Sequence, residues 1–138
     1  MAAEIDDDTR ALLEGPNYVH LATLMADGSP HSVAVWAGLE DGLVCFFTQP
    51  GSLKARNVER DARVALSITD HENPYRTAQL RGTVVATRDG DEALAVMDRL
   101  SRLYTGHDFP MRSGRLYLVE PTSVRFTQLP FVHAPASA

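Results

Sequence analysis

The sequence predicts a mainly β domain: about six antiparallel strands in a small barrel, with one short helix and one longer helix outside it. Short runs rich in β-branched and aromatic residues recur along the chain. Asp-Gly pairs, which are typical of hairpin turns, separate the first three runs. Helical periodicity is confined to a few segments, too few for the alternating strands and helices of a parallel sheet.

Composition limits the classes of function. The chain has 138 residues, which suits one domain with its own core, so we take residues 1–138 as a single domain with loose tails at 1–6 and 132–138. The net charge of −5 argues against general affinity for nucleic acid or membrane surfaces. One cysteine, Cys45, excludes an internal disulfide, and the acidic N-terminus lacks a secretion signal. We expect a cytoplasmic protein.

Residues 18–48 predict a three-stranded antiparallel meander. Strand-like runs lie at residues 18–25, 31–37 and 43–48. Asp27-Gly28 and Asp41-Gly42 separate them, and Asp-Gly between such runs favours a two-residue turn. With such a turn at Asp27-Gly28, His31 is expected opposite Leu24 and His20 near Val35.

One helix is predicted before this meander and a longer one in the second half of the chain. A short N-terminal helix, capped by Asp8 or Thr9, is expected to end near residue 14, before Gly15-Pro16. A longer helix is expected from a cap at Asp89 or Asp91 to about residue 104, where apolar residues recur at helical spacing.

The remaining strands are predicted at residues 63–68, 78–87, 115–120 and 123–127, with the last two split at Pro121. Gly82 lies inside the second of these and indicates a bulge or a close approach by another backbone or a ligand. Polar segments at 69–76 and 107–114 predict loops.

The stretch "FFTQPGSLKARN" predicts an anion site. It reads as a strand end, a turn and a short helix over residues 53–60, with Ser52 as N-cap. Lys54, the only lysine, and Arg56 fall in the first helical turn, where the helix dipole disfavours cations. Together with Thr48 and the free N–H groups after Ser52, they form a candidate phosphate cradle. The alternative is a solvated helix face with two ordinary surface cations.

Four segments in order resemble one known family: "LATLMADGSPHSVAVW", "FFTQPGSLKARNVERDARVALSI", "AQLRGTVV" and "YTGHDFPMRSGRLYLVEPTSVRF". The chain resembles the pyridoxamine 5′-phosphate oxidase-like split-barrel flavoproteins, and most closely their branch of reductases that use the deazaflavin coenzyme F420. This resemblance implies an FMN-binding-like split β-barrel. It also implies a homodimer with the cofactor at the subunit interface, its phosphate at the short helix and its ring over the second strand.

The resemblance also implies site residues on the second strand. The cofactor ring is expected against the backbone of Ser32, Val33 and Val35, with Trp36 as a ring contact or as a core or interface aromatic. Strand alternation places Ser32 and Trp36 on the face opposite Val33 and Val35. Arg76 is a candidate for the anionic tail of the cofactor, or it faces water.

The implied function is hydride transfer from reduced F420 to a small organic acceptor, such as an activated alkene or a quinone. Two alternatives remain: an FMN-dependent oxidase or flavin reductase of the same fold, and a non-enzymatic protein that stores or senses F420. We name no catalytic side chain. The five histidines show no metal-site spacing, and Cys45 is expected to be a buried core residue.

Overall fold

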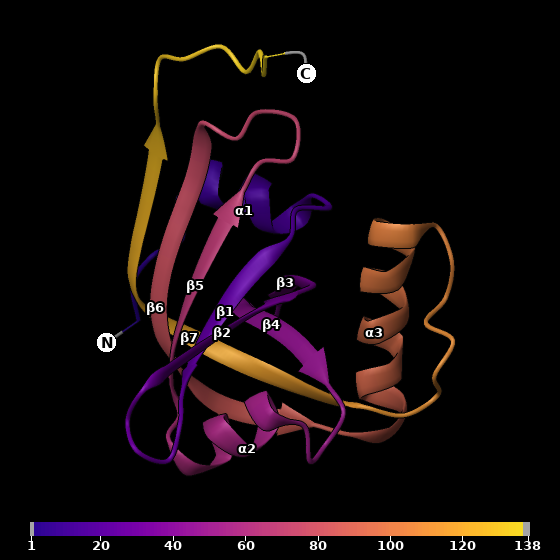
Figure 1. Ribbon diagram of the computed structural model, residues 1–138. Helices are drawn as coiled ribbons and strands as arrows, with labels where there is room; N and C mark the ends of the chain where they lie inside the picture. The colour runs from indigo at the N-terminus through magenta and orange to yellow at the C-terminus, as the bar shows by residue number, and fades with distance from the viewer. Residues whose placement is uncertain (1, 137–138) are drawn as a thin grey trace.

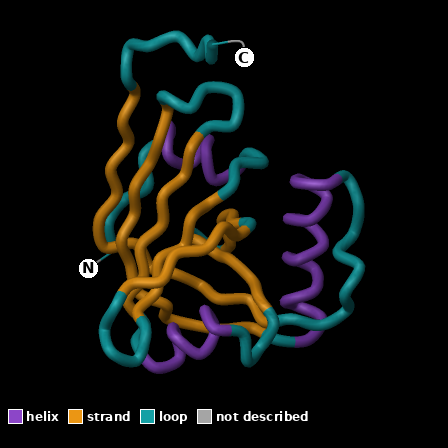
Figure 2. The backbone as a smooth tube through the Cα atoms, viewed as in Figure 1, coloured by secondary structure: helices purple, strands orange, loops and turns teal. Residues whose placement is uncertain are grey.

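The computed structural model describes residues 2–136, which form a seven-stranded sheet and three helices (Figures 1 and 2). In chain order the elements are α1 (Asp7–Glu14), β1 (Val19–Leu24), β2 (Pro30–Val35), β3 (Ala37–Glu40), β4 (Leu43–Thr48), α2 (Leu53–Arg60), β5 (Arg63–Thr69), β6 (Arg76–Arg88), α3 (Gly90–Thr105) and β7 (Arg115–Gln128). The strand order is β2-β1-β5-β6-β7-β4-β3, with every neighbouring pair antiparallel. The predicted class, a mainly β antiparallel split barrel, is confirmed.

The two edge strands of this sheet, β2 and β3, are consecutive in the chain and separated by Trp36 alone. The backbone therefore leads directly from one edge of the sheet to the other. The long strands β6 and β7 lie in the middle of the strand order and curve strongly (Figure 1). The predicted meander is wrong at this point. The run at residues 31–37 divides at Trp36, so β2 pairs with β1 and β3 pairs with β4.

The β1–β2 hairpin differs in register from the prediction. Leu24 pairs with Pro30 and Thr23 with His31, so five residues, 25–29, form the connection. Asp27 accepts hydrogen bonds at Oδ1 from the backbone N–H of Ser29, at 2.9 Å, and from its hydroxyl. This side-chain turn stabilises a longer loop than Asp-Gly alone indicates.

Strand β7 runs through Pro121 instead of ending there. Gly82 pairs with Pro121 and Arg81 with Ser123, so Thr122 is the extra residue of a bulge. A Cβ on Gly82 would lie 2.5 Å from the carbonyl oxygen of Glu120, which explains the glycine. The predicted bulge and close backbone approach at Gly82 are confirmed, and the predicted split at Pro121 is wrong because the bulge accommodates the proline.

Helix α1 begins two or three residues earlier than expected. Its N-cap is Asp6, whose Oδ1 accepts the N–H of Thr9 at 2.8 Å, so the predicted caps Asp8 and Thr9 lie inside the helix. Upstream, the N–H of Ala3 donates to Pro121 at 2.8 Å and Ile5 packs against the core. This part of the expected loose lead-in is docked on the fold.

Two apolar clusters hold the sheet and helices together. One fills the barrel and includes Leu21, Phe46 and Tyr117; the other lies between the sheet and α3 and includes Met97 and Leu116. Helix α3, capped at its C-terminus by Gly106 in the left-handed conformation, lies beside the sheet (Figure 1).

Helix α3 also covers the free edge of β3. Arg99 Nη2 donates to the carbonyl of Leu39 at 3.0 Å, and the Tyr104 hydroxyl lies 3.4 Å from the N–H and 3.3 Å from the carbonyl of Ala37. Side chains of α3 therefore satisfy backbone groups that an edge strand would otherwise leave open.

Candidate functional site

Helix α2 spans Leu53–Arg60 with Ser52 as N-cap, as predicted. The Ser52 hydroxyl accepts the N–H of Ala55 at 3.3 Å and lies 3.0 Å from the Thr48 hydroxyl. Thr48 ends β4 and is nearly buried, so the strand end and the helix start are joined through two side chains. The N–H groups of Leu53 and Lys54 have no hydrogen-bond acceptor within the described part of the chain.

The charges of α2 differ between its two ends. At the C-terminal end, Glu59 pairs with Arg115 at 3.2 Å and Asp61 pairs with Arg63 at 2.7 Å. The hydrogen bonds from Arg63 lower the pKa of Asp61 to about 2. At the N-terminal end, Lys54 and Arg56 make no ion pair with any of residues 2–136. The two acids near the C-terminal end of α2 are thus neutralised by arginines, whereas the two cations at its N-terminal end have no acidic partner within residues 2–136.

Lys54 lines a hollow of about 250 Å³ whose other walls are mostly aromatic. The lining residues are Tyr18, Ala34, Val35, Trp36, Phe47, Lys54 and Phe109, and we call this site the aromatic hollow. It contains one cation and no carboxylate. Such a site suits a planar conjugated ligand with an anionic group.

Trp36 is the centre of the aromatic packing. Its ring stacks on Tyr104, with centroids 5.2 Å apart and planes 11° apart. Phe47 and Phe109 meet it edge-on, at 6.0 Å and 6.2 Å, and meet each other at 5.0 Å. The Tyr104 hydroxyl donates to the carbonyl of Asn17 at 2.6 Å, and burial raises the pKa of Tyr104. Tyr104, itself held by Asn17, thus fixes the position of the Trp36 ring in the wall of the hollow.

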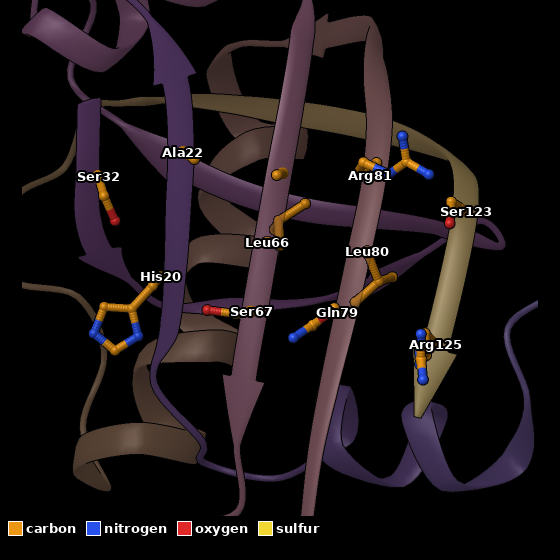
Figure 3. A pocket seen from close by; sticks show the side chains of 11 residues that line it. His20, Ala22, Ser32, Leu66, Ser67, Gln79, Leu80, Arg81, Ser123 and Arg125 are labelled. Carbon is orange, nitrogen blue, oxygen red and sulfur yellow. The ribbon is translucent and has the colours of Figure 1, made fainter. Parts of the chain in front are cut away.

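A second, wider depression lies on the outer face of the sheet, across β2, β1, β5, β6 and β7 (Figure 3). This outer groove, of about 490 Å³, is lined by His20, Ala22, Ser32, Ala65, Leu66, Ser67, Gln79, Leu80, Arg81, Ser123 and Arg125. No acid is among them. Ser32 and Ala34, two residues apart on β2, lie in the outer groove and the aromatic hollow respectively, so β2 connects the two depressions.

The structure brings some predicted residues together and separates others. Lys54, Val35 and Trp36 line one hollow, and Thr48 at the end of β4 contacts Ser52 at the start of α2. Val33 packs against the barrel core, as the expected alternation with Ser32 requires. Arg56 is exposed and does not line the hollow, because residues two apart on a helix point in different directions.

Arg76 lies apart from these residues. It begins β6 at the end of the sheet opposite α2 (Figure 1). It pairs with Asp70 at 3.4 Å and Asp8 at 3.6 Å, and its guanidinium lies 5.1 Å from the Phe126 ring centroid. These contacts account for Arg76 structurally.

Three aromatic residues of the lining, Tyr18, Phe47 and Phe109, are absent from the site that the sequence predicts. They come from the approach to β1, from β4 and from the loop after α3, and meet only in the folded chain. Tyr18 and Phe47 fall in predicted strands and Phe109 falls in a predicted loop. No local signal separates a pocket wall from a core position.

Other kinds of site find no support in the described residues. No group of three or more metal-binding side chains occurs within residues 2–136. Cys45 is fully buried, as expected, and burial raises the pKa of its thiol to about 12, which leaves it unreactive. None of the helices in residues 2–136 has the length and apolar character needed to cross a bilayer.

Comparison with known proteins places this arrangement in a family. Residues 5–128 match the family model described as pyridoxamine 5′-phosphate oxidase. A solved structure named F420 reductase is 30% identical, with a TM-score of 0.76 over 88% of this chain and 98% of that one. No curated protein matches.

Two more distant structures share the fold. A conserved hypothetical protein from Mycobacterium tuberculosis is 22% identical, with a TM-score of 0.78 over 99% of this chain and 95% of that one. HupZ from Group A Streptococcus is 15% identical, with a TM-score of 0.66 over 90% and 94% of the two chains. On the family match over residues 5–128 and the 30% identical neighbour, the chain belongs to the pyridoxamine 5′-phosphate oxidase-like split-barrel family.

Proposed function

We propose that this protein is an F420H2-dependent oxidoreductase that passes a hydride to a small organic acceptor, such as an activated alkene or a quinone. One observation carries the proposal: Lys54, without an acidic partner in residues 2–136, lines an aromatic hollow at the start of α2. The 30% identical structure named F420 reductase supports deazaflavin as the cofactor.

The residues of the aromatic hollow fit such a cofactor. The Lys54 ammonium and the free N–H groups of Leu53 and Lys54 suit its phosphate. Trp36 and Val35 suit one side of a planar ring and exclude water from it. When bound, the deazaflavin supplies the hydride chemistry, and the protein supplies binding and orientation.

A proton is also needed when a hydride is added to an acceptor. The ionisable side chains that line the hollow are Tyr18 and Lys54. Tyr18 is 59% exposed, so water has access to the same place. We therefore assign the proton to solvent or to the Tyr18 hydroxyl and assign no obligatory general acid.

The proposal includes a homodimer with the cofactor at the subunit interface. The aromatic hollow has about 250 Å³, which is below the roughly 300–1,000 Å³ of most ligand pockets. A second subunit would supply the missing walls. A ligand or partner lying along β2 would contact both Ala34 in the hollow and Ser32 in the outer groove.

The test is direct titration with F420 and with FMN. Trp36 is the only tryptophan and lines the hollow, so its fluorescence reports binding there. We expect colourless purified protein, quenching by F420 and reduction of enones or quinones by F420H2. Yellow protein with bound flavin would instead establish the FMN-dependent alternative, with which the family match is also compatible. Tight F420 binding without turnover of any acceptor would establish storage or sensing.

A further inference from the structure

The loop between α3 and β7, residues 107–114, contributes one side chain to the aromatic hollow, that of Phe109. Apart from Phe109 and Gly114, the residues of this loop are exposed. Phe109 packs edge-on against Phe47, with centroids 5.0 Å apart and planes at 79°, and against Trp36 at 6.2 Å and 82°. Its ring therefore takes up space in the hollow beside the expected ring site.

A charge clamp holds the backbone of Phe109. Asp98 on α3 accepts two hydrogen bonds from Arg112, at 2.8 Å and 2.9 Å, and a third from the Phe109 N–H at 3.0 Å. Arg112 also donates to the Phe109 carbonyl at 2.8 Å. Both backbone polar groups of Phe109 thus bind the Asp98–Arg112 pair, and the Asp98 carboxylate is 12% exposed.

The Asp98–Arg112 pair fixes one particular residue of the loop, Phe109, in addition to closing the loop. A bidentate arginine–carboxylate pair fixes orientation as well as distance. Here the fixed residue is the one that projects into the hollow, while its neighbour Met111 is 53% exposed and lines no part of it. The clamp therefore sets the position of one wall of the hollow.

We propose that Phe109 is a specificity-determining residue that limits the size of the acceptor, and that Asp98 and Arg112 are its positioning residues. This inference rests on the proposed function, since it places the acceptor beside the cofactor ring, against the Phe109 wall of the aromatic hollow. Phe109 admits a flat, small conjugated acceptor and excludes one with additional fused rings. A smaller side chain at position 109 opens the hollow to the larger acceptor.

The test compares quinones of one, two and three rings: duroquinone, naphthoquinone and anthraquinone sulfonate. For Phe109→Ala we expect the ratio of kcat/KM for the three-ring to the one-ring acceptor to rise about tenfold. Arg112→Gln should shift the same ratio in the same direction by less. Met111→Ala, in the same loop, is the matched control and should leave the ratio unchanged.

The ratio separates specificity from stability, because a general structural defect lowers turnover of all three acceptors together. An unchanged ratio in Phe109→Ala, with F420 affinity intact, would overturn the inference. Phe109→Leu replaces it if the alanine variant does not fold. Calorimetric binding of the same quinones without reduced cofactor gives a second ratio. If wild type reduces neither these quinones nor any enone, the proposed function fails, while the binding ratio still decides the role of Phe109.

Discussion

Asn57 Nδ2 donates a hydrogen bond to Thr23 Oγ1 at 3.0 Å, and the two residues are 1% and 2% exposed. This bond joins the middle of α2 to β1. Asn57 Oδ1 in turn accepts from Arg60 Nη2 at 2.6 Å. The helix that presents Lys54 is therefore anchored by a buried polar side chain about one turn further along.

Asn57→Ala is expected to destabilise the fold by about 2 to 3 kcal/mol, because it leaves the buried Thr23 hydroxyl without its partner. Urea denaturation measures this change. Thr23→Val combined with Asn57→Leu should cost less than the sum of the two single substitutions, since both polar groups are then removed. Strict additivity would show that the bond has no energetic weight.

Lys54→Ala should weaken F420 binding by about 10- to 100-fold, because a charge-assisted contact to the phosphate is lost. Arg56→Ala, in the same helical turn but outside the hollow, is the matched control and should change the affinity by less than about threefold. Titration of Trp36 fluorescence measures both. Equal losses in the two variants would contradict the assignment of Lys54.

Tyr104→Phe keeps the ring stacked on Trp36 and removes the hydroxyl that donates to Asn17. We expect a loss of roughly 1 to 2 kcal/mol with little change in Trp36 emission. Tyr104→Leu should also shift that emission to longer wavelength and increase quenching by acrylamide, because the indole loses its cover. Tyr75 contacts Phe131 near the C-terminus, away from Trp36. Tyr75→Leu is therefore the control and should leave Trp36 emission unchanged.

The Asp98–Arg112 pair predicts a pH dependence. Hydrogen bonds from Arg112 lower the pKa of Asp98 to about 2, below the ordinary value of 3.8. A pKa that is lower in the folded protein adds stability above about pH 4, and this contribution is lost as the pH falls toward about 2. The difference in unfolding free energy between wild type and Asp98→Asn should therefore shrink between about pH 5 and pH 2. A difference that stays constant with pH would exclude this titration.

Gly82→Ala should destabilise the fold by about 3 kcal/mol, because the new Cβ would lie 2.5 Å from Glu120 O and 2.8 Å from Val119 Cγ1. Gly28→Ala provides the comparison: its φ is +85° but nothing lies within 4 Å of an added Cβ. There only backbone strain of about 1 kcal/mol is expected. Thermal or urea unfolding of the two variants separates the two causes. Similar losses would refute the close approach at Gly82.

Local sequence signals determined the elements whose causes are themselves local. The N-cap at Ser52 and the helix Leu53–Arg60 follow from residues within one turn. The glycine at position 82 indicated a close backbone approach because no other residue type fits there. Where pairing with a distant strand determined the structure, the prediction was wrong. Strand β7 continues through Pro121 because its bulge at Thr122 keeps it paired with β6.

The aromatic hollow shows the same division. The sequence alone singled out Lys54, Val35 and Trp36, because the turn, the helix start and the family motifs are contiguous in the chain. Tertiary structure alone brought Phe109 and Tyr104 to Trp36, since ring packing depends on helix α3 lying against the sheet. The sequence does not show which apolar side chains will contact one another. The hydrophobic effect is non-directional, so any apolar partner of suitable shape can bury a given side chain.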